Sequence, residues 1–243
     1  MDFDIRIGKV KRLLIIAIGT LILFHLLGQF SAHILGHRRL FGFVEMFRMQ
    51  SERNAPTYFS GVLLAWAGCL LLFISQAMAK PGGRDRGYWL ALGLMFWYLS
   101  LDEVISIHEN FGYYTRQMPM FSFLAYKWVV VGLLLALAVV GVFFRFWWRL
   151  EPKTRFWFAV SAGVYLGGAI GVETASGLYG KAYDEGFGFS VFIVFEEGME
   201  MAGVAIFIVT LLGVIRDRVG SFQVRVLGSE APSAATADAE INR

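Results

Sequence analysis

The sequence has too little charge to be that of a soluble protein. Charged residues make up 17% of its 243 positions, whereas hydrophobic residues make up 57%, and the mean hydropathy is +0.58. This composition indicates a polytopic membrane protein. The chain also has a single cysteine, Cys69, inside an apolar run, which excludes an internal disulfide framework and suits a small packing residue.

Several familiar functional motifs are missing as well. The chain has no glycine-rich phosphate loop, no Gly-x-Ser-x-Gly motif and no haem-attachment motif. It also lacks a basic surface interleaved with aromatic residues, so we expect no nucleic-acid partner. The net charge of +3 follows from basic loops.

Six apolar runs are each long enough to cross about 30 Å of hydrocarbon at about 1.5 Å per residue. The sequence therefore predicts an all-α bundle of six transmembrane helices in one domain, residues 1–218, followed by a disordered cytoplasmic tail, 219–243, which is rich in Gly, Ser, Ala and Pro. The expected spans are residues 13–35, 58–79, 87–109, 126–148, 156–178 and 190–215.

The distribution of basic residues predicts the orientation. With the N-terminus inside, fifteen of the 22 Lys and Arg residues fall on the cytoplasmic side and seven on the other. The positive-inside rule then places both termini in the cytoplasm, and we expect a multi-pass protein of the bacterial plasma (inner) membrane. The first run has no small-residue cleavage site and is read as a retained signal anchor.

The stretch from Trp97 to Gly112, WYLSLDEVISIHENFG, places ionisable groups at the end of an apolar helix. On an α-helix, Asp102, Ser106 and Glu109 form one stripe, and Glu103 and His108 flank this stripe on opposite sides. This pattern predicts a site that faces the bundle.

A second acidic group lies in the sixth run. Glu196, Glu197 and Glu200 occupy one helical sector, and each ionised carboxylate costs about 2.5–3.5 kcal/mol near the centre of a membrane helix. Glu173, at the end of the glycine-rich fifth run, falls at a similar predicted depth. Something must neutralise these charges.

The first run carries His25, Gln29, His33 and His37 at four-residue intervals. One interpretation is hydrogen bonding between helices; the other is that imidazoles, His33 among them, join the acidic site. The next segment, 38–57, has apolar residues at helical spacing and is expected to form an amphipathic helix in the outer interface. Glu52 and Arg53 then either cap the site or belong to a solvated loop.

Carboxylates with imidazoles and without thiolates suit Fe, Mn, Zn or Ca. The sequence predicts a divalent-metal site, with these ligands: Asp102, Glu109, Glu173, Glu196, Glu200 and His33. A general acid or base would come from Glu103, His108 or Glu197. The alternatives are a metal-free network of protonated carboxyls that specifies helix packing, and a proton path. The Glu-x-x-His pattern of di-iron bundles is absent from both acidic stretches.

Three stretches, FRMQSERNAPTYFS, LSLDEVISIHE and FEEGMEMAG, resemble a group of uncharacterised bacterial integral membrane proteins that share them. The resemblance covers most of the first, third and sixth helices and implies no particular reaction. It supports the importance of a set of motif residues: Glu52, Pro56, Asp102, Glu103, His108, Glu109, Glu196, Glu197 and Glu200.

The predicted function is that of a metal-dependent membrane enzyme, a hydrolase or oxidase acting on a lipid-like or small periplasmic substrate. The acidic groups fall in the outer half of the membrane, and no ionisable relay continues toward the cytoplasm, so a one-sided pocket is favoured. A divalent-cation or proton-coupled transporter, and a non-catalytic metal-binding or sensor protein, are the alternatives.

Overall fold

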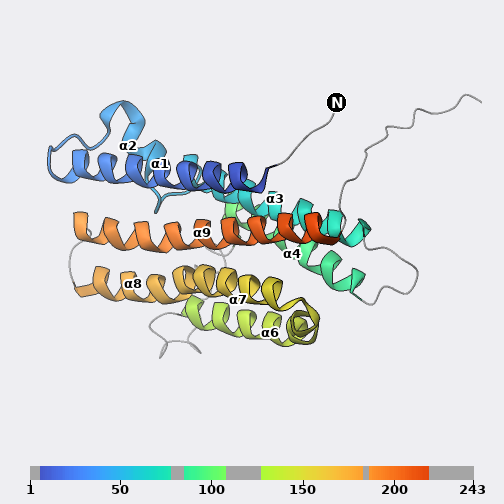
Figure 1. Ribbon diagram of the computed structural model, residues 1–243. Helices are drawn as coiled ribbons and strands as arrows, with labels where there is room; N and C mark the ends of the chain where they lie inside the picture. The colour runs from blue at the N-terminus through green and yellow to red at the C-terminus, as the bar shows by residue number, and fades with distance from the viewer. Residues whose placement is uncertain (1–5, 78–84, 108–126, 183–185, 219–243) are drawn as a thin grey trace, which may run out of the picture.

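The computed structural model describes residues 6–77, 85–107, 127–182 and 186–218, and their regular structure is helical throughout. Figure 1 shows the helices side by side in a bundle. The elements, in chain order, are α1 (Ile7–His33), η1 (Leu40–Gly42), α2 (Phe43–Phe47), α3 (Ala55–Ala77), α4 (Arg86–Ile105), α6 (Lys127–Arg149), α7 (Pro152–Leu166), η3 (Gly167–Val172), α8 (Glu173–Ala182) and α9 (Phe187–Arg218).

Among the described residues, six helical stretches are long and apolar enough to span a membrane. They begin and end close to the six predicted runs, and the fifth stretch, Pro152–Gly180, joins α7, η3 and part of α8. The prediction of an all-helical membrane bundle is confirmed at this level. The orientation of the termini stays a prediction.

α9 lies at the centre of the bundle and contacts α1, α3, α7, η3 and α8, while α3 and α4 form a close pair. Serine hydroxyls join helices in both places: Ser100 Oγ donates to the Gly61 carbonyl at 2.8 Å, and Ser161 Oγ donates to the Gly203 carbonyl at 2.8 Å. Hydrogen bonds of this kind link membrane helices where hydrophobic burial gives no driving force. The backbone of α9 is thereby fixed against α7.

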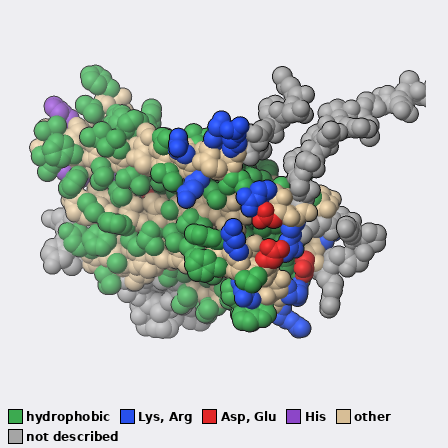
Figure 2. Space-filling model, viewed as in Figure 1, with side chains coloured by type: hydrophobic (Ala, Val, Ile, Leu, Met, Phe, Trp, Pro, Cys, Tyr) green, Lys and Arg blue, Asp and Glu red, His purple; other side chains and the backbone are tan. Residues whose placement is uncertain are grey.

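One end of the bundle is basic. On the face shown in Figure 2, Lys and Arg side chains gather where α1 begins and α9 ends, and hydrophobic side chains cover most of the remaining surface. Arg149 contacts Asp85 at this end with Nη2 and Oδ1 2.5 Å apart, and the guanidinium of Arg155 stacks over Trp148. Arginine and tryptophan at one level of a bundle are typical of a membrane interface.

The structure differs from two sequence predictions about local structure. The third helix ends at Ile105, because Ser106 adopts a left-handed conformation (φ 58°), so the helix that carries Asp102 stops before Ser106. Between residue 38 and the start of α3 at Ala55, only the five residues Phe43–Phe47 form an α-helix. It is preceded by positive φ values at Phe41 and Gly42.

Candidate carboxylate site

Glu196, Glu197 and Glu200 lie on an unbroken part of α9, so the prediction that they occupy one sector is confirmed. All three are partly buried inside the bundle. None of the three forms an ion pair within the part of the chain that the structure describes. Their charges must be compensated by something other than a described Lys or Arg.

The fifth stretch approaches these glutamates through an unusual piece of backbone. Residues Gly167–Val172 form a π-helix, a rare element that is often found at functional sites. A Cβ at Gly168 would lie 2.7 Å from the Glu196 carbonyl oxygen and 3.2 Å from Glu200 Cγ. Only glycine therefore allows η3 to lie directly on the glutamate turn of α9.

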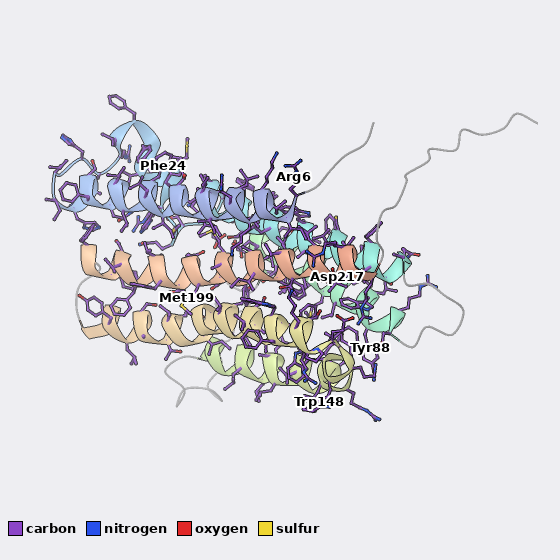
Figure 3. The ribbon with its side chains drawn as sticks, in the orientation of Figure 1. Arg6, Phe24, Tyr88, Trp148, Met199 and Asp217 are labelled. Carbon is purple, nitrogen blue, oxygen red and sulfur yellow. The ribbon has the colours of Figure 1, made fainter. Side chains whose placement is uncertain are left out.

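Figure 3 shows Met199 between α9 and the α7–α8 stretch, away from the end marked by Tyr88, Trp148 and Asp217. Its Cε would lie 2.9 Å from a Cβ at Gly167. The side chain therefore packs against η3 beside the glutamates.

Carboxylates from other elements converge on the same turn. Glu200 interacts electrostatically with Glu197, Glu103, Glu196 and Glu173, and Glu197 also interacts with Glu52. We refer to these six residues as the carboxylate cluster: Glu52, Glu103, Glu173, Glu196, Glu197 and Glu200. They come from α4, α8, α9 and the connection before α3, so segments distant in sequence form one acidic centre.

Ser176 on α8 connects two members of the cluster. Its Oγ lies 3.1 Å from Glu196 Oε2 and 3.0 Å from the Glu173 carbonyl oxygen. A hydroxyl has one proton, so it donates to one of these oxygens at a time. Ser176 is buried and orients the Glu196 carboxyl toward α8.

A small cavity lies within the cluster. It is lined by polar groups of Ser60, Glu103, Tyr165 and Glu200 and by the apolar side chains of Leu63, Leu64, Met201 and Val204. The space open to the centre of a water molecule is about 10 Å³, close to the minimum that holds one water. Glu103 of α4 and Glu200 of α9 thus face a common space.

The bundle is apolar on the other side of this cavity. Phe207 stacks on Phe96 with ring centroids 4.8 Å apart and contacts Phe158 at 4.8 Å, and Trp89 packs edge-on against Phe158. We refer to the buried residues here as the apolar plug: Leu71, Ile74, Trp89, Phe158, Phe207, Ile208 and Leu211. The plug closes the bundle between the cluster and its basic end.

The structure brings together only some of the predicted site residues. Glu103, Glu173, Glu196, Glu197 and Glu200 meet, whereas His33 is exposed in the last turn of α1. Asp102 interacts electrostatically with Tyr165, which lines the cavity. The predicted residues His108 and Glu109 lie outside the described residues. Among those described, no three His, Cys, Asp or Glu side chains are arranged as a metal-ligand set.

Three contributors to the site were missed by sequence reasoning. Tyr165 and Ser60 line the cavity, and Ser176 contacts Glu196. Single hydroxyls in apolar helices give no periodic signal. The only available sign was the run of glycines at 163, 167, 168 and 171, which indicated close helix packing but no particular partner.

The sequence profile of one protein family, described as a domain of unknown function (DUF8692), matches residues 13–215. The chain belongs to this family. The DUF8692 match runs from α1 to α9 and so includes the whole carboxylate cluster and the apolar plug. No curated protein and no solved structure matches the chain.

Proposed function

We propose that this DUF8692 protein is a membrane enzyme whose carboxylate cluster binds a divalent cation, one of Fe, Mn, Zn or Ca. The observation that carries the proposal is that five partly buried carboxylates interact within the bundle, on Glu103, Glu173, Glu196, Glu197 and Glu200, with no described ion pair for the three on α9. Carboxylate oxygens are hard ligands that suit these ions.

The electrostatic argument favours a cation over a purely structural role. Each carboxylate within a membrane helix carries a cost of about 2.5–3.5 kcal/mol when ionised near the centre. A packing interface can be built from serine and glycine, as Ser161 and Gly203 show. The five carboxylates on the helices are therefore explained better by a bound ion than by packing, and a divalent ion neutralises two charges at once.

The metal would be held by Glu196 and Glu200, with Asp102, Glu109 or Glu173 completing the shell. Glu103, Glu197 and His108 would supply the general acid or base. His33 is left out of this set because it is exposed in the last turn of α1. Because the described residues contain no ready ligand triad, ion binding must draw the carboxylates closer together.

The apolar plug favours an enzyme over a transporter. A transported ion has to leave on the far side, and the described residues between the cluster and the basic end present Phe207, Phe158 and Trp89. A fixed metal needs access from one side only, with an open position for water or substrate. In the proposed orientation, the basic end of the bundle lies on the cytoplasmic side of the bacterial inner membrane. The site then lies in the outer half of the bilayer, which suits a lipid-like or periplasmic substrate.

Two parallel assays test the enzyme against the transporter. Proteoliposomes are tested for divalent-cation flux, and lipid extracts are compared among wild-type, deletion and Glu200→Gln strains. We expect no cation flux with the wild-type protein. We expect the lipid extracts of both mutant strains to differ from that of the wild type. Cation flux that disappears with Glu200→Gln, together with unchanged extracts, would contradict the enzyme.

A further inference from the structure

A second polar centre, separate from the carboxylate cluster, lies on α1. His25 and Gln29 are 1% and 2% exposed and stand one helical turn apart, so their side chains share a face of the helix. That face packs against α9 and the connection between α2 and α3. Both are therefore buried polar side chains within the part of the bundle that the structure describes.

The hydrogen bond to His25 identifies its tautomer. The backbone N–H of Met49 donates to His25 Nδ1 at 3.1 Å, so Nδ1 carries the lone pair. A neutral imidazole with an acceptor at Nδ1 has its proton on Nε2. Nε2 is therefore a buried donor, and it has no hydrogen-bond partner among the described residues.

Gln29 likewise has a buried donor without a described partner. The hydroxyl of Ser190 on α9 donates to Gln29 Oε1 at 3.3 Å, which leaves the amide NH₂ as the remaining polar group. That nitrogen, Nε2, also has no partner in the described part of the chain. Leaving a buried donor unpaired is costly, and two on one helix face call for a common acceptor.

The backbone nearby supplies the complementary groups. The carbonyls of Phe47 and Ser190 lie close to the His25 ring, but neither has the geometry of a hydrogen bond with Nε2. An anion would be repelled by these two oxygens, whereas a water oxygen can accept from both nitrogens while its protons are donated to the carbonyls. Buried waters commonly make two to four such bonds to groups that are otherwise unpaired.

We propose that His25 and Gln29 bind one buried water, which joins α1 to α9 and to the α2–α3 connection. The site uses His25 Nε2 and Gln29 Nε2 as donors and the carbonyls of Phe47 and Ser190 as acceptors. It is independent of the proposed metal chemistry.

The hydrogen bond from Met49 to His25 also fixes the connection that carries Glu52. Met49 belongs to the α2–α3 connection, which continues to Asn54. The Asn54 side chain donates to the Arg48 carbonyl and accepts from the Thr57 N–H at 3.2 Å. Glu52, which acts on Glu197, lies within this closed loop. The Met49–His25 bond and the Asn54 bonds therefore hold the connection that carries Glu52.

Solid-state NMR of the protein in bilayers tests the proposal directly. The chain has four histidines, so the triple variant His33→Asn, His37→Asn, His108→Asn leaves His25 as the single imidazole. With ¹⁵N-labelled histidine, we expect a protonated Nε2, an unprotonated Nδ1 and magnetisation transfer from water to Nε2. A protonated Nδ1, or no transfer from water to Nε2, would overturn the proposal.

A pair of variants gives a second measurement. Ser190→Ala removes only the bond to Gln29 Oε1, whereas Gln29→Leu removes that bond and the amide donor together. If the water is bound, the melting temperature falls further for Gln29→Leu than for Ser190→Ala. If the site is empty, the order reverses, because leucine removes an unpaired donor while Ser190→Ala leaves another unpaired group behind.

Discussion

Two parts of α9 show how one helix serves two purposes. Around Glu196–Glu200 it meets carboxylates from α4, α8 and the α2–α3 connection, and around Phe207 it meets aromatic rings from α4 and α7. A neighbouring helix approaches α9 closely in both parts. Gly168 lets η3 lie against the Glu196 turn, and Gly203 of α9 leaves room for Tyr165 of α7. Backbone packing is thus similar, and the side chains alone decide which part is able to bind a cation.

The largest stability effect is expected in the apolar plug. Phe207→Ala removes a ring that is 6% exposed and stacks on Phe96, and such truncations cost about 3–5 kcal/mol. The control is Phe195→Ala on the same helix, where the ring is 59% exposed and would face lipid. Thermal unfolding in detergent should show a large loss for Phe207→Ala alone. Equal losses would mean that the plug is not a packed core.

A smaller effect is expected where η3 meets α9. In Gly168→Ala the new Cβ would lie 2.7 Å from the Glu196 carbonyl oxygen, so the backbones must separate, at a cost of about 1–3 kcal/mol. Gly171→Ala, in the same π-helix, meets nothing within 4 Å and is the matched control. We expect Gly168→Ala to lower both the melting temperature and divalent-metal affinity, and Gly171→Ala to change neither. Unchanged metal affinity in Gly168→Ala would separate η3 from the site.

The smallest effect distinguishes the two parts by chemistry alone. Ser176→Ala and Ser161→Ala each remove one buried hydroxyl, worth about 0.5–1.5 kcal/mol. Ser176 contacts Glu196, whereas Ser161 contacts the Gly203 carbonyl. Isothermal titration with Mn²⁺ should show weaker binding for Ser176→Ala only. Weakening of the same size in both variants would point to a general loss of packing.

The sequence predicted the helices well because long apolar runs leave little choice of structure in a bilayer. It also predicted the glutamate sector of α9, since a continuous helix preserves spacing. It failed at Ser106, where a left-handed residue ends α4 without a glycine or proline to signal it. The π-helix at Gly167–Val172 and the pairing of His25 with Met49 depend on tertiary packing, so no local pattern announced them.

The central claim, that the carboxylates of α9 bind a divalent cation, is tested most directly by metal analysis of the purified protein. After loading with Mn, Fe, Zn or Ca, the wild type should retain at least one ion. The double variant Glu196→Gln, Glu200→Gln should lose it, and the control Glu45→Gln, an exposed carboxylate on α2, should keep it. Absence of any ion from the wild type under all four loading conditions, or retention of the ion by the double variant, would contradict the account.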